Sequence, residues 1–220
     1  MDTRQQNALK KAKNFIKLLS CFSLLAAPLL SAVGWGISHD SLSSLFDLNL
    51  FHQAKNRAFY LSPTSDPALI FRYFLLPHYF LYASMPLYIA STITITNFTY
   101  KIAPWTSFIG AILSIIGSVY FIGVLGAYLS APLGSVSMTG IIQLSFVLCL
   151  LLFVGNILLG ISLYRNRVNS KWTSALFILG NSLILTFPGI ENWMTLGSLC
   201  MLFPMYQLSR RLYEEIDFNR

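Results

Sequence analysis

The sequence predicts an all-α, polytopic transmembrane helix bundle with about six spans and with both termini in the cytoplasm. Of its 220 residues, 55% are hydrophobic and 10% are charged, whereas about a quarter of the residues are charged in an ordinary soluble domain. The apolar residues form long runs that approach or exceed the roughly 20-residue helix needed to cross a hydrocarbon core. These runs do not alternate polar and apolar residues as barrel strands do, so the spans are predicted to be helices.

The first two spans are expected at 15–36 and 69–96. A basic segment precedes the first span as in a signal peptide, but the apolar run is longer than the usual 7 to 15 residues. We therefore predict an uncleaved span, followed by an outer connection over 37–68. The second span contains Pro77 and Pro86, which predict a kinked or tilted helix.

The remaining spans are expected at 105–129, 138–163, 172–187 and 193–208. Each of the last two has only about 16 residues, or roughly 24 Å of helix at 1.5 Å per residue. A helical hairpin that fails to cross the membrane fully is therefore an open alternative for this pair. The chain then ends in a cytoplasmic tail, 209–220.

The tail is predicted to continue the last span as an amphipathic helix. Leu212 and Ile216 fall on one stripe with Leu208, and Arg211 lies one turn before Glu215. Such a helix is suited to lying on the membrane or docking a partner, and a solvated helical tail is the alternative.

Charge predicts the orientation of the spans. The outer segments hold only Lys55, Arg57 and Arg72 among the 15 Lys and Arg residues, as the positive-inside rule requires. Tryptophan favours the membrane interface, and all four tryptophans fall at predicted span ends. These tryptophans are Trp35, Trp105, Trp172 and Trp193. The basic residues of the predicted inner segments are Arg4, Lys10, Lys11, Lys13, Lys17, Lys101, Arg165, Arg167, Lys171, Arg210, Arg211 and Arg220.

Ionisable residues inside spans are candidates for function because they are costly to place in lipid. Arg72 and His78 share the second span, and His78 lies about 9 Å deeper along the helix. One interpretation is a neutral imidazole that is hydrogen-bonded inside the bundle. The other is an outward-facing ligand site, formed by Arg72, His78, Tyr79 and Tyr82, that would suit a quinone or a lipid headgroup.

Two sets of polar or small residues are expected to pack helices together. Small residues recur every four positions in the third span and predict a ridge where another helix approaches closely. Amide side chains in the fourth and fifth spans are predicted to bond across helices. The ridge consists of Gly110, Ser114 and Ser118, and the amides are Gln143, Asn156 and Asn181.

Several chemistries lack their parts in the sequence. No catalytic motif and no Asp or Glu inside a span is found, so no catalytic residue is assigned. No metal or cofactor is predicted, because His39, Asp40, Asp47 and His52 match no ligand spacing and no second intramembrane histidine completes a haem site. Nucleic-acid binding is not expected, since the basic residues are those that set the topology.

The segment LLGISLYRNRVNSKWTSALFILGNSLI resembles small bacterial six-span proteins that are assigned to domains of unknown function. This resemblance implies six helices in a bacterial cytoplasmic membrane, and it supplies no activity and no functional residues. The features that carry it are Gly160, Leu163, Arg165, Trp172, Leu176 and Gly180.

The sequence thus predicts a non-catalytic, multi-pass protein of the cell membrane that acts as a membrane subunit or as an accessory or immunity factor. Its expected partners are the lipid bilayer, other membrane proteins or a second copy of the chain. One alternative is a permease-like protein that binds a small molecule or lipid around Arg72 and His78. A second is a membrane enzyme, which would need polar residues converging at one membrane depth.

Overall fold

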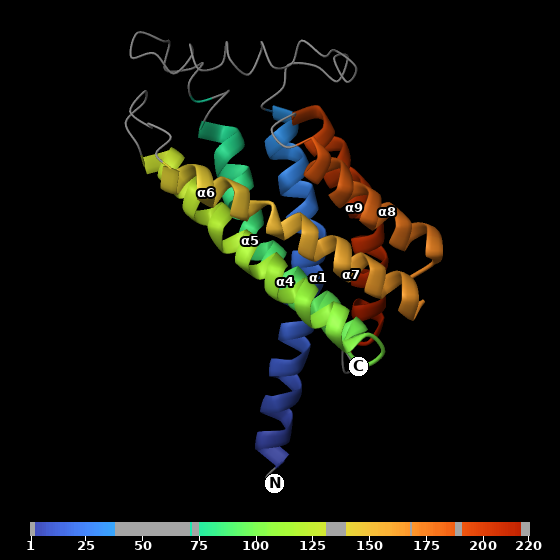
Figure 1. Ribbon diagram of the computed structural model, residues 1–220. Helices are drawn as coiled ribbons and strands as arrows, with labels where there is room; N and C mark the ends of the chain where they lie inside the picture. Colours follow the sequence, from blue (N-terminus) through green and yellow to red (C-terminus); the bar gives the residue numbers. More distant parts are fainter. Residues whose placement is uncertain are drawn as a thin grey trace.

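The computed structural model describes residues 3–37, 71, 75–130, 140–167, 169–187 and 191–216. Within these ranges the regular structure is α-helical and contains no strand, which confirms the all-α part of the predicted fold class (Figure 1). The helices are α1 (Thr3–Ile37), α4 (Leu76–Thr99), α5 (Pro104–Ser130), α6 (Gly140–Cys149), α7 (Leu151–Asn166), α8 (Lys171–Thr186) and α9 (Glu191–Glu214).

The helices pack largely in sequence order and form a closed ring of neighbours. α1 packs against α4, α4 against α5, α5 against α7, α7 against α8, and α8 against α9. α9 then returns to α1, so the first and last helices lie side by side (Figure 1). Their contacts run antiparallel, because Ser31 bonds Ser198 while Lys17 bonds Glu215.

Three helical segments are long and apolar enough to cross a membrane. They are Ala8–Ile37, Pro104–Ala127 and Val147–Asn166, with mean hydropathies of 1.9, 2.3 and 2.4. These segments correspond to the first, third and fourth predicted spans. α4, α8 and α9 lie at the second, fifth and sixth predicted spans. α8 has only 16 residues, and α4 and α9 carry more polar side chains than the three apolar segments do.

The fourth predicted span is interrupted at Leu150, where α6 ends and α7 begins. A tight turn forms at this point, with Leu150 N donating to Val147 O at 3.1 Å and Phe153 N donating to Leu150 O at 3.0 Å. The interruption lies where α5 comes closest, because the backbone at Leu152 touches the position of Gly117. Close backbone contact between these helices therefore coincides with the departure from regular helix.

The bundle buries hydroxyl and amide side chains and exposes large apolar ones. Ser84, Ser114, Asn156 and Asn181 are at most 1% exposed. The outer surfaces instead carry apolar side chains such as Phe108, Ile112, Val119, Leu144 and Leu199. This distribution is typical of a protein solvated by lipid, where Ser, Thr and Asn bond between helices or to their own backbone.

Glycines set the distance between α5 and α7. A Cβ atom built on Gly110 would lie 2.9 Å from Gly155 O, and one built on Gly117 would lie 2.7 Å from the Cα atom of Leu152. Real Cβ atoms essentially never approach so closely, so neither glycine can carry a side chain without movement of backbone. Gly180 of α8 and Gly197 of α9 approach each other's carbonyl oxygens in the same way, at 2.5 Å from a built Cβ.

Gly117→Ala is expected to destabilise the protein by about 2 kcal/mol through overpacking against the α7 backbone. Gly123 is the matched control on the same helix, since nothing lies within 4 Å of a Cβ built there. Gly123→Ala should be neutral or stabilising by up to about 1 kcal/mol, because alanine favours helix. Unfolding in mixed detergent micelles measures both variants, and equal stabilities would contradict the proposed close contact.

Candidate functional site

Positive charge gathers at one end of the bundle. The α4–α5 turn and the α7–α8 turn meet there, because Asn166 Nδ2 donates to Thr99 O at 2.9 Å. The α7–α8 turn also contacts α9, through Asn169 Nδ2 and Pro204 O at 3.2 Å. The turns and adjoining helix ends at this end of the bundle carry Lys101, Arg165, Arg167, Lys171, Arg210 and Arg211.

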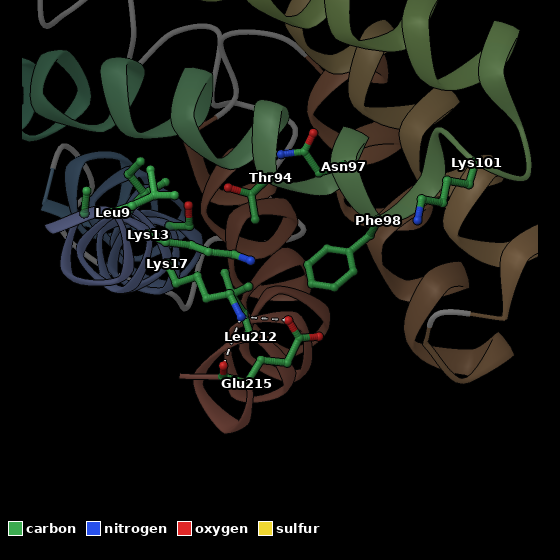
Figure 2. Close-up of a pocket in the computed structure, with 12 residues that line it drawn as sticks. Leu9, Lys13, Lys17, Thr94, Asn97, Phe98, Lys101, Leu212 and Glu215 are labelled. Carbon is green, nitrogen blue, oxygen red and sulfur yellow. Dashed lines mark hydrogen bonds and ion pairs between the residues drawn. The ribbon is translucent and has the colours of Figure 1, made fainter. Parts of the chain in front are cut away.

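A cleft of about 670 Å³ opens at this charged end between α1, α4 and the end of α9 (Figure 2). Its volume falls within the roughly 300 to 1,000 Å³ of small-molecule sites. α1 contributes Leu9, Ala12, Lys13, Ile16, Lys17 and Ser20, α4 and its following turn contribute Thr94, Asn97, Phe98 and Lys101, and α9 and the residue after it contribute Leu212 and Glu215.

The α1 wall of the cleft is a single helix face. Its residues are separated by three or four positions, which places them above one another along the helix. The α4 wall follows the same spacing from Thr94 to Lys101. The α1 wall therefore presents both basic and apolar side chains to the cleft, and the α4 wall adds Phe98 and Lys101. Figure 2 shows Lys13 and Lys17 extending from α1 toward the other helices.

Lys17 joins α1 to the C-terminal end of α9. Its Nζ atom donates to Glu215 Oε2 at 3.1 Å and to the Glu215 carbonyl oxygen at 3.0 Å. Neither Lys13 nor Lys101 forms an ion pair with any residue that the structure describes. The lining thus has three ammonium groups and one carboxylate, so the cleft carries a net positive charge.

The floor of the cleft is apolar. Leu212 packs with Cys21 and Ile216 in a small buried cluster, and Phe98 packs against it from α4. Two further bonds hold α1 on α9 at this level, from Cys21 Sγ to Ser209 O at 3.3 Å and from Ser209 Oγ to Cys21 O at 3.1 Å. A ligand in the cleft would meet ammonium groups and a hydrocarbon surface together.

The site expected around His78 is only partly described. Arg72 lies outside the described residues, and His78, in the first turn of α4, is half-buried and takes part in an interaction. Tyr79 and Tyr82 point away from the bundle interior, with 53% and 40% of their surfaces exposed. The two tyrosines therefore border the outside of the bundle.

The predicted ridge lies in the interface between α5 and α7. Ser114 Oγ donates to Asn156 Oδ1 at 3.0 Å, and Thr92 Oγ1 lies 2.9 Å from the same Ser114 oxygen, which links α4, α5 and α7. Gly110 touches α7 at Gly155, while Ser118 donates to the Ser114 carbonyl of its own helix.

The other two predicted amides do not add a described bond between helices. Asn181 Nδ2 donates to Phe177 O within α8 at 2.8 Å, because one turn of helix brings that carbonyl within reach. Gln143 lies in α6 with its side chain outside the described residues.

The described part of the predicted tail 209–220, which is residues 209–216, packs against the bundle more than the prediction of a separate tail implied. α9 continues unbroken to Glu214, and the stripe of Leu208, Leu212 and Ile216 is buried against other helices. Glu215 pairs with Lys17 and not with Arg211, because α1 lies closer to its carboxylate. A contact between distant parts of the chain thus replaces the expected local one.

The cleft was not predicted, although its lysines were identified. The sequence interpretation used the lysines for orientation and for attraction to anionic lipid, and it assigned none of them to a binding site. The signal was the spacing of Leu9, Lys13, Ile16 and Lys17, which puts two cations and two apolar side chains on one helix face. The pairing of that face with α9 had no local signature, because Lys17 and Glu215 are 198 positions apart.

Comparison with known proteins gives no relative: no family model, no curated protein and no solved structure matches the chain. Among the residues that the structure describes, no three His, Cys, Asp or Glu side chains gather so that they could hold a metal ion.

Ser114→Ala and Asn156→Ala should each lower stability, and together they should show a coupling energy of about 0.6 kcal/mol or more. A double-mutant cycle of unfolding free energies in mixed micelles measures this term. Ser118→Ala with Asn156→Ala is the matched cycle, because Ser118 bonds its own backbone. A coupling no larger for Ser114 than for Ser118 would show that the bond between α5 and α7 does not contribute.

Proposed function

We propose that this chain is a non-catalytic integral membrane protein that acts as a subunit or accessory factor through lipid and protein contacts. Its contact site is the basic cleft between α1, α4 and α9. The observation that carries the proposal is the composition of this cleft, where three lysines stand over an apolar floor at the charged end of the bundle. Such a surface suits recognition of an amphiphilic partner.

We further propose that the six helical units within the described residues, with α6 and α7 taken as one, cross the membrane and that the charged end faces the cytoplasm. Successive helices run in opposite directions, which places Trp105 and Trp172 at the charged end and Trp35 and Trp193 at the other. Lysine and arginine are retained on the cytoplasmic side. The short α8 would span by local thinning of the bilayer.

Thiol labelling in intact cells tests the orientation and the passage of α8. In a chain whose three cysteines are replaced by alanine, Glu191→Cys should react with a membrane-impermeant reagent. Arg165→Cys, in the last turn of α7 at the charged end of the bundle, should react only after the cells are permeabilised. Equal protection of both positions in intact cells would contradict six spans.

Purification of the full chain in mild detergent tests the contact function. We expect phospholipid, a second polypeptide or a second copy to remain bound, as measured by phosphate analysis and by mass determination. Ile16→Gln should reduce this retention severalfold, because Ile16 lines the cleft.

Phe15→Gln is the matched control, since Phe15 is the neighbouring residue, is exposed to a similar extent (65% against 62%) and lies outside the cleft. A lone monomer without lipid or partner would overturn the proposed function.

A further inference from the structure

The cleft combines two features that a single class of ligand satisfies. Its ammonium groups favour the binding of an anion, and Lys13 and Lys101 have no ion-pair partner among the residues that the structure describes. Its apolar lining favours contact with a hydrocarbon surface. Leu9 and Ile16, on the same face of α1 as Lys13, are 63% and 62% exposed, which is costly in water but not against an acyl chain.

The position of the cleft favours a lipid over a soluble phosphate ester. It opens along α1, one of the three helices apolar enough to cross a membrane. Basic pockets between transmembrane helices on the cytoplasmic side are suited to anionic headgroups, and the cytoplasmic leaflet holds anionic lipid. A lipid can enter such a cleft from within the leaflet without leaving the membrane.

Glu215 opposes an anion in the cleft. Its carboxylate pairs with the Lys17 ammonium at 3.1 Å (Figure 2). A phosphate bound to Lys17 would be repelled by this carboxylate. Glu215 is 58% exposed at its side chain, so it can turn to solvent when the phosphate arrives. Lys17 can still donate to the Glu215 carbonyl, because an ammonium group has three donors.

We propose that the cleft binds an anionic glycerophospholipid, whose headgroup phosphate contacts Lys13 and Lys17 and displaces the Glu215 carboxylate. This inference rests on the proposed contact function and names the ligand of the same site. Glu215 acts as an intramolecular competitor that limits affinity, so lipid binding loosens the ion pair between α1 and α9. Lys101 adds to the positive field from the far side of Phe98, as Figure 2 shows.

Native mass spectrometry of the full-length protein in detergent tests this proposal with three probes. The probes are phosphatidylglycerol, phosphatidylcholine and glycerol phosphate. We expect phosphatidylglycerol to bind at least about fivefold more tightly than phosphatidylcholine, as one net charge contact near a membrane surface provides. Glycerol phosphate should neither bind at comparable concentration nor compete.

Lysine variants connect the preference to the cleft. Lys13→Gln should lower the affinity for phosphatidylglycerol about fivefold while affinity for phosphatidylcholine stays unchanged. Lys11→Gln removes the same charge from a neighbouring position of α1 that does not line the cleft, and it should have little effect. Because Lys13 is exposed and lacks an ion pair with the described residues, the variant should fold, and its helical circular dichroism and melting temperature provide the check.

Glutamate variants test the competition. Glu215→Gln should raise the affinity for phosphatidylglycerol about fivefold, because a neutral amide cannot repel the phosphate. Glu214→Gln is the matched control, since Glu214 is the adjacent residue and does not line the cleft. Its Oε1 atom accepts from Arg210 Nε at 2.9 Å. Equal effects of the two glutamate variants would overturn the competition.

The outcomes separate this inference from the proposed function. Equal binding of phosphatidylglycerol and phosphatidylcholine, or glycerol phosphate binding as tightly as the lipid, overturns the inference. Neither result contradicts the proposed contact function if Ile16→Gln still reduces the retention of a lipid or partner. Loss of that retention effect overturns the contact function itself.

Discussion

Close backbone contact between α5 and α7 is the constraint on which the rest of the bundle depends. Under the proposed membrane location, lipid supplies no hydrophobic force between the helices, so their association relies on van der Waals packing and on bonds between buried polar groups. Gly110, Gly117 and Gly155 bring the two backbones together, and at this distance Ser114 reaches Asn156. The same serine reaches Thr92, which fixes α4 against the pair and with it one wall of the cleft.

The cleft exists because the α1–α9 interface opens toward its charged end. Farther from the charged end, hydrogen bonds hold α1 and α9 together at two positions, Ser31 to Ser198 at 3.1 Å and Cys21 to Ser209 at 3.1 to 3.3 Å. Between these bonds and the charged end the side chains are longer and charged, and an ion pair between Lys17 and Glu215 joins α1 to the end of α9. A contact between small residues thus gives way to a lined space that can receive a ligand.

The sequence was sufficient for features that a single segment carries. The helical class and three apolar spans follow from run length, and each of the four tryptophans lies within two residues of a helix end. Features made by distant segments were out of reach: the bond from Lys17 to Glu215 joins positions 198 residues apart, and the break at Leu150 coincides with a contact from α5. Of the predicted amides, Asn156 bonds another helix, whereas Asn181 bonds its own, because amide chemistry does not specify which acceptor lies nearest.

Closure of the ring by α9 has a consequence for how the protein is made. α1 is synthesised before α9, and the face that carries Lys17 and Cys21 meets its partner only after α9 has been made, because Lys17 and Glu215 are 198 positions apart. Until then this face lacks the contacts that bury Cys21 and pair Lys17. The cleft therefore forms only after α1, α4 and α9 have come together, and a ligand bound in it would report that α9 has docked on α1.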